Sequence, residues 1–510
     1  MTRKRLILLF LTVFAIAKIF LSLGASWNEP QVQSRLQLFQ TDLVLHGAEF
    51  ATEQGDRLTA LLGKDTYLEA QKQYEKAKKE VEQNRDRLQA QLAPEISSPD
   101  RGQAVEFVET PQQNQILEAI AQIDREIDEL DVNVGILQAS RGELKTARET
   151  WQNVQGRSPS FNIANTVGTL QGLWQEPMDI ASDAEITLQN NLKGWFRFQA
   201  LSRLYEGTQQ EKALSSLQAE EEAISQGAIV KLAFIAGIPI VGGVFGISLL
   251  LVLLAQWILQ KERSLLGTSA KGWEVAWDGE VTWQVLIVGF FALSQLILPL
   301  VIPLAIALLG LNIAAFSLAE KALYILITYL LMTMGGFSVL YFSIRSFFPL
   351  PEGWFRFQWL SKWVLWGMGG YFVAVPLVLI VSLVNQQIWQ GQGGGNPIIL
   401  LALQAQDRWA LFLFWITAAL AAPVFEEIMF RGFLLPSLTR YVPVWGAIGI
   451  SGLIFAIAHL SLAEVLPLTV LGIILGFVYA RSRNLLASIL LHSLWNSGTL
   501  LSLFILGSNT

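Results

Sequence analysis

The sequence has no cysteine, and this absence excludes disulfide bonds, thiol nucleophiles and zinc or iron–sulfur sites held by cysteine. Histidine is scarce as well: only three occur in 510 residues, and none stands in the His-Glu-x-x-His pattern of the common zinc-protease helix. Charged residues make up 15%, against about 25% in soluble domains, and the net charge is −6. A wholly soluble or disordered chain is therefore excluded, and we expect no nucleic-acid partner.

Hydrophobic residues are plentiful instead, at 52%, and the first apolar run covers residues 6–24. This run is long enough to cross a bilayer, and Arg3, Lys4 and Arg5 precede it. No Ala-x-Ala cleavage pattern follows it, which favours an uncleaved anchor over a signal peptide. We predict a transmembrane anchor over 1–25, with the N-terminus in the cytoplasm.

Residues 26–225 are polar and show helical periodicity, first in 67–92 and then in 112–150. In the second stretch, six apolar residues recur at spacings of three and four: Ile116, Leu117, Ile120, Ile123, Ile127 and Leu130. Pro94, Pro99 and Gly102 lie between the two stretches, so we predict an antiparallel helical hairpin or coiled coil, with a third helical stretch over about 182–225. We expect this domain to hold a protein partner or to act as a spacer. A lone His46 in such a region indicates a structural role.

From residue 226 onward the sequence is dominated by long apolar runs, typical of membrane spans. With the anchor they make about nine, and the runs after it cover 229–259, 282–310, 321–344, 363–384, 409–424, 444–462, 465–480 and 485–508. We divide this part into helices without motifs (226–400) and a core that carries motifs (401–510). The fold class predicted is an all-α, polytopic transmembrane bundle with an extramembrane helical domain inserted after the first span.

Basic residues support one orientation of these spans. If the spans alternate from a cytoplasmic N-terminus, all the basic flanks fall on the cytoplasmic side: Lys261, Arg263, Arg345, Lys362, Arg431, Arg440, Arg481 and Arg483. Residues 26–225 then lie outside the cytoplasm. We predict a multi-pass protein of a bacterial plasma membrane or another internal membrane.

One hexapeptide, GWFRFQ, occurs twice, at 194–199 and at 353–358. Aromatic residues mixed with arginine suit a membrane interface. The predicted topology places the two copies on opposite sides of the membrane, which argues against a shared binding role.

Ionisable residues inside apolar segments need a reason, because each costs about 2.5–3.5 kcal/mol on insertion scales. Glu427 and Arg431 are four residues apart on a helix, in the favourable order for an ion pair. Glu426 points about 100° away from Glu427, so it cannot easily share the same arginine. We therefore expect Glu427 to be neutralised and Glu426 to face a cavity. Pro423, just before them, is expected to break or kink the helix.

Two further pairs have the same spacing of four residues. Phe455 lies one turn before His459 and is expected to restrict its rotamer, and His492 lies one turn before Asn496. Three separate segments can thus direct four polar side chains at one point: Glu426, His459, His492 and Asn496. The alternative for each is structural, since buried ion pairs and asparagines often only join helices. Bringing them together requires tilted, broken or re-entrant helices around Pro423 and Pro436, because His459 falls late in its segment.

The pattern Glu-Glu-x-x-x-Arg at 426–431, Phe-x-x-x-His at 455–459 and His-x-x-x-Asn at 492–496 resembles the CPBP family of intramembrane proteases. This family includes the type II CAAX prenyl endopeptidases and the bacteriocin-processing proteins. The resemblance covers about 405–505 and implies hydrolysis of a peptide bond in or beside the membrane.

The resemblance also implies roles for the motif residues. Glu426 would act as general base on a water that His459 orients, and His492 and Asn496 would donate hydrogen bonds to the oxyanion. Glu427, Arg431 and Phe455 would support the site. A second mechanism stays open, in which Glu426, His459 and His492 hold one Zn²⁺.

Two other functions stay open. The first is a catalytically silent membrane scaffold or assembly factor built around 26–225. The second is a transporter that uses the buried acid and histidines as a proton relay, although no inverted repeat is evident in the sequence.

Overall fold

The computed structural model describes residues 2–27, 29, 31–54, 65–96, 111–267, 272–395, 401 and 407–507. Every regular element in these ranges is a helix, and none is a β-strand, which confirms the predicted all-α fold. The chain separates into two compact units. We call Gln33–Phe234 the arm unit, and Met1–Val32 together with Ile235–Asn509 the bundle unit.

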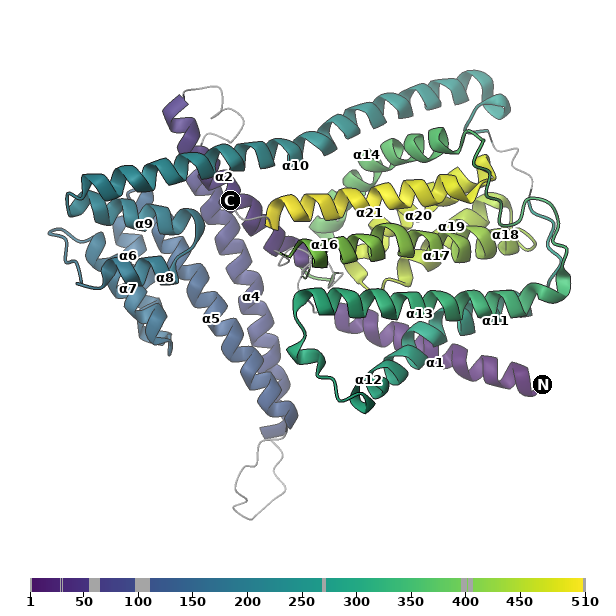
Figure 1. The fold of residues 1–510 in the computed structure, drawn as a ribbon, viewed down its shortest axis with the longest axis horizontal. Coiled ribbons are helices and arrows are strands. Elements are labelled where there is room, and N and C mark those ends of the chain that lie inside the picture. The colour runs from purple at the N-terminus through teal and green to yellow at the C-terminus, as the bar shows by residue number, and fades with distance from the viewer. Residues whose placement is uncertain are drawn as a thin grey trace, which may run out of the picture. The chain divides into compact units, whose positions relative to one another are not determined.

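The arm unit is built from helices of 8 to 31 residues and from the first part of the long helix α10 (Figure 1). The helical stretch predicted over about 182–225 consists of three helices, because the chain turns near Lys193 and again near Gln209. The helices are α2 (Val32–Gln54), α4 (Thr66–Ile96), α5 (Pro111–Ser140), α6 (Leu144–Arg157), α7 (Phe161–Leu173), α8 (Ala184–Asn191), α9 (Gly194–Gly207) and the first part of α10 (Glu211–Gln260).

Helices α4 and α5 form the predicted antiparallel pair and lie side by side in Figure 1. Lys78 Nζ lies 2.7 Å from Asp131 Oδ1, and Arg85 Nη1 lies 3.6 Å from Asp124 Oδ1. The two helices therefore run antiparallel to each other. Of the predicted loop residues, Pro94 lies inside α4, while Pro99 and Gly102 lie outside the described residues. The coiled-coil character of the pair stays a prediction.

His46 is buried inside the arm unit and links two of its helices. Its Nδ1 lies 2.5 Å from Glu221 Oε1 of α10, and its Nε2 lies 3.7 Å from Asp42 Oδ2 of α2. Burial by itself would lower the pKa of His46, but the hydrogen bond to Glu221 and the negative charges of Asp42, Glu221 and Glu49 raise it overall. This arrangement fits the structural role predicted for His46.

The bundle unit contains the apolar helices. Eight helices among the described residues are long and apolar enough to cross a membrane: α1 (Arg3–Ser26), α10, Gly279–Leu308, Leu318–Phe347, α14 (Trp363–Trp389), Arg408–Leu438, α20 (Leu462–Ser482) and α21 (Leu485–Leu506 of Leu485–Gly507). The helix formed by the remaining predicted span, 444–462, is shorter than the other eight. It is α19 (Val444–Ile457), whose 14 residues extend about 21 Å against a hydrocarbon core of about 30 Å.

Long-range hydrogen bonds define one end of the bundle unit. Arg481 donates to the carbonyls of Ser264 and Gly267, and Arg440 donates to the carbonyl of Trp277 at 2.7 Å. The loop after α10 and the ends of α18 (Leu435–Leu438) and α20 therefore meet here. We call this the basic end, because helix termini bring these residues to it: Lys4, Arg5, Lys261, Arg263, Arg345, Lys362, Arg440, Arg481 and Arg483.

A second set of hydrogen bonds defines the opposite end. The Ser26 hydroxyl, at the end of α1, accepts from the backbone N–H of Leu462 at 3.1 Å. Ser461 donates to the carbonyl of Gly393, just after α14, at 3.2 Å. The beginning of α20 is thus at the opposite end although α19 is short, since residues 458–461 complete the path. The helices alternate between the two ends in the order that the sequence predicts.

Candidate functional site

One long helix carries both motif glutamates, and it is not a regular α-helix. It runs without a break from Arg408 to Leu438, through α16 (Arg408–Trp415), the π-helix η5 (Ile416–Ala421), α17 (Ala422–Glu427), the π-helix η6 (Ile428–Leu434) and α18. A break of the helix at Pro423 or Pro436 is therefore wrong, while the kink or tilt that we also expected there stays a prediction. Proline has no N–H to offer the carbonyl four residues earlier, and wider π turns keep the chain helical around it.

The span predicted over 409–424 was too short, because the chain stays helical through Pro423 as far as Leu438. The helix continues past it, so Arg431 is not a flanking charge at the membrane surface. Its side chain is fully buried.

Glu427 and Arg431 form the ion pair that their spacing predicts. Arg431 Nη1 lies 2.6 Å from Glu427 Oε1, and both side chains have zero exposure. Arg431 also donates to the carbonyl of Gly472 on α20 at 3.1 Å, and its guanidinium lies 4.4 Å from the centre of the Phe455 ring. The pair therefore ties its own helix to α20 and to α19.

His492 connects this pair to the second glutamate. Its Nδ1 lies 3.0 Å from Glu427 Oε1, and its Nε2 lies 3.9 Å from Glu426 Oε2. We assign a proton to Nδ1, because a carboxylate that already binds Arg431 can only accept. With Nδ1 held in this way, the imidazole presents Nε2 to Glu426.

Glu426 is the less buried carboxylate of the two, with 14% of its side chain exposed against 0% for Glu427, although its Oε2 atom is itself buried. Its Oε1 accepts a hydrogen bond from the hydroxyl of Tyr329 at 3.0 Å, from α13 (Leu318–Ile344). Its Oε2 has no hydrogen-bond partner among the described residues. One oxygen of Glu426 is thus fixed, and the other is left for chemistry.

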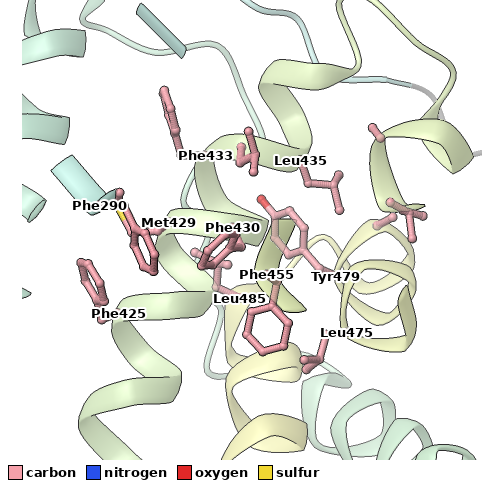
Figure 2. Close-up of a cluster of buried hydrophobic side chains, with 14 of the residues drawn as sticks. Phe290, Phe425, Met429, Phe430, Phe433, Leu435, Phe455, Leu475, Tyr479 and Leu485 are labelled. Carbon is pink, nitrogen blue, oxygen red and sulfur yellow. The ribbon is translucent and has the colours of Figure 1, made fainter. Parts of the chain in front are cut away.

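Phe455 packs against Phe430 and belongs to the buried cluster shown in Figure 2, which also contains Leu475. Its ring centre lies 4.9 Å from that of His459 and 5.6 Å from that of His492, edge to face in both cases. His459 Nδ1 lies 2.9 Å from the Phe455 carbonyl, which fixes its proton on Nδ1 and leaves Nε2 open. His459 is half-buried.

Asn496 lies one turn beyond His492 on α21 and is half-buried. It donates through Nδ2 to the carbonyl of Ala418 at 2.7 Å, within the π-helix η5. Because an amide nitrogen carries two hydrogens, one donor of Asn496 stays available.

Among the described residues, the structure therefore brings some of the predicted site residues into direct contact and leaves others without a hydrogen bond to Glu426. Glu426 and His492 face one another, and His459 joins them through the ring of Phe455. Within the described ranges, no hydrogen bond connects His459 or Asn496 to Glu426.

The zinc alternative can be tested on the same geometry. Glutamate and histidine are suitable zinc ligands, but among the described residues no three acidic or histidine side chains converge closely enough to hold a metal ion. The side chains as placed do not fit the ion, and we derive no step through it. The zinc mechanism stays a prediction.

Comparison with known proteins finds a family model that matches this part of the chain. Residues 408–498 match the model described as Type II CAAX prenyl endopeptidase Rce1-like. This matched segment contains Glu426, His459, His492 and Asn496. This match supports the resemblance to the CPBP family of CAAX-protease-like membrane peptidases seen in the sequence.

Two curated relatives cover the same part. The chain is 29% identical over 136 residues to "Putative membrane peptidase YdiL" of Bacillus subtilis (strain 168), which is 26% of this chain and 54% of the relative. It is 27% identical over 143 residues to "Membrane-embedded CAAX protease MroQ" of Staphylococcus aureus (strain USA300), 27% of this chain and 57% of the relative. The chain thus spans about half the length of the relatives it matches. No solved structure matches it.

Sequence reasoning missed three contacts of the site: the Tyr329 hydroxyl, the Ala418 carbonyl and the Gly472 carbonyl. A tyrosine in an apolar helix is ordinary, and every residue has a carbonyl. No pattern in the sequence distinguishes these three, because each acts on a helix far away in the chain.

Proposed function

We propose that this protein is an intramembrane endopeptidase that hydrolyses a peptide bond with an activated water. The observation that carries the proposal is the free Oε2 of Glu426, opposite Nε2 of His492 and set among apolar helices. A carboxylate with one oxygen fixed and the other unused is suited to general-base catalysis.

In the proposed reaction, the water oxygen attacks the carbonyl carbon of the substrate and a proton passes to Glu426 Oε2. The tetrahedral intermediate then collapses, the carbon–nitrogen bond breaks, and the proton passes from Glu426 to the leaving amine. His459, through Nε2, orients the water. The second N–H of Asn496 donates to the oxyanion.

The predicted role of His492 as an oxyanion donor depends on which of its ring nitrogens carry a proton. Since its Nδ1–H is directed at Glu427, it donates to an oxyanion through Nε2 only when both ring nitrogens are protonated. Two carboxylates and one guanidinium leave one negative charge in this buried cluster, which an imidazolium would neutralise. We propose that His492 fills this donor role through Nε2.

The orientation in the membrane is part of the proposal. The basic end faces the cytoplasm under the positive-inside rule, which places the N-terminus in the cytoplasm and the arm unit outside it.

The test compares purified wild-type protein with Glu426→Gln in detergent. Cleavage of membrane peptides ending in Cys-aliphatic-aliphatic-X, farnesylated and unmodified, is followed by mass spectrometry of the new termini. We expect Glu426→Gln to lose at least about 10²–10⁴ in rate, whereas Glu352→Gln, at an exposed loop position, keeps the wild-type rate. Equal cleavage by wild type and Glu426→Gln would overturn the proposal. Loss of activity with a chelator and recovery with Zn²⁺ would instead support the metal mechanism.

A further inference from the structure

We propose that Tyr329 is a positioning residue for Glu426, so that α13 completes the hydrolytic site. Tyr329 lies well before the matched segment 408–498, in the part of the chain where the sequence shows no motif. The inference rests on the proposed function, and it adds a group that neither the motifs nor the family model contains.

The first argument is the geometry of the carboxylate. The Tyr329 hydroxyl donates to Oε1 of Glu426 at 3.0 Å, while His492 Nε2 faces Oε2 at 3.9 Å. A carboxylate fixed at one oxygen has a defined plane, so the direction of its second oxygen is defined as well. Without the phenol, Glu426 can rotate about its side-chain bonds, and the fraction of time in which Oε2 faces the substrate falls.

The second argument is that the phenol is held in place by close helix packing. Gly336 lies two turns after Tyr329 on the same face of α13. A Cβ at Gly336 would come within 2.7 Å of the Phe425 ring and 2.9 Å of the Gly289 carbonyl, so only glycine allows this approach. Phe425 directly precedes Glu426, and this packing therefore brings α13 to the catalytic helix.

The ring of Phe425 completes the support. It stands edge to face against the Tyr329 ring, with centres 6.2 Å apart at 89°, and Phe337 contacts its other side at 5.4 Å. A phenol positioned by packed rings loses little freedom when it forms its hydrogen bond.

The experiment compares Tyr329→Phe with Tyr324→Phe in the full-length protein. Tyr324 lies on the same helix, and its hydroxyl has no hydrogen bond among the described residues. We expect Tyr329→Phe to lower kcat about 10- to 100-fold, with KM and the thermal midpoint unchanged, and Tyr324→Phe to match wild type. Replacing Tyr329 by p-aminophenylalanine, which keeps a donor at that point of the ring, should recover most of kcat.

The outcomes separate this inference from the proposed function. If wild type cleaves, Glu426→Gln does not, and Tyr329→Phe cleaves at the wild-type rate, then the inference is wrong and the proposed function stands. If Tyr329→Phe loses activity only in proportion to a lowered thermal midpoint, and p-aminophenylalanine restores none of it, Tyr329 is merely structural and the inference is again wrong. If wild type cleaves none of the peptides at a rate above Glu426→Gln, both fail together.

Discussion

Replacing Arg431 by methionine tests whether the buried ion pair supports the site. The side chain of Arg431 is fully enclosed and makes three interactions: with Glu427, with the Gly472 carbonyl and with the face of the Phe455 ring. Methionine fills much of the volume of the arginine stem but supplies no charge or donor. Among the residues that the structure describes, the carboxylate of Glu427 would then retain only His492 as a partner.

The expected cost follows from the environment of the charge that is left. Removing one partner of a fully buried pair leaves an uncompensated charge, which typically destabilises by about 3–5 kcal/mol. The same reasoning predicts partial rescue. Adding Glu427→Gln to Arg431→Met removes the orphaned charge, so the double variant should be more stable than Arg431→Met alone.

The assay is equilibrium unfolding of the full-length protein in mixed micelles, followed by tryptophan fluorescence. The matched control is Arg440→Met, because Arg440 also donates to backbone carbonyls but is exposed at the basic end; we expect it to cost about 1 kcal/mol or less. An Arg431→Met variant no less stable than Arg440→Met, or a double variant less stable than Arg431→Met, would refute the reasoning.

Two further predictions concern pH and topology. Because the pKa of His46 is raised in the folded protein, its stabilising contribution is complete below the ordinary value near 6.5 and is lost as pH rises through the raised value. The amide hydrogen-exchange rates of α2 in wild type and in His46→Gln should therefore become equal as pH rises. A ratio of these two rates that does not change with pH would contradict this prediction. Since the chain has no cysteine, single cysteines report topology. A membrane-impermeant maleimide should label Gln155→Cys in intact cells but Ser346→Cys only after permeabilisation, and the reverse pattern would overturn the orientation.

The sequence was sufficient for the parts of the site that lie on one helix. A spacing of four residues is about one turn of an α-helix or of a π-helix, so Glu427 lies beside Arg431 although the π-helix η6 begins directly after Glu427. The same regularity placed Phe455 against His459. It also separated Glu426 from Glu427, and the structure gives these two carboxylates different partners.

Contacts between helices were beyond the sequence. The Tyr329–Glu426 hydrogen bond joins residues 97 positions apart, and it depends on how closely α13 approaches the catalytic helix at Gly336. The π turns around Pro423 were also missed, since proline normally indicates a break and only the surrounding helices decide that the chain stays helical.

The repeated hexapeptide GWFRFQ shows which properties the sequence determines and which the tertiary structure determines. At 194–199 it begins the helix α9, whereas at 353–358 the same six residues lie outside any helix. In both copies the tryptophan is buried and its Nε1 donates a hydrogen bond, from Trp195 to Glu49 and from Trp354 to the carbonyl of Glu274. Side-chain chemistry determined that each indole is buried with its N–H satisfied. The backbone conformation was decided by the tertiary structure, because six residues are too few to form a stable helix without packing.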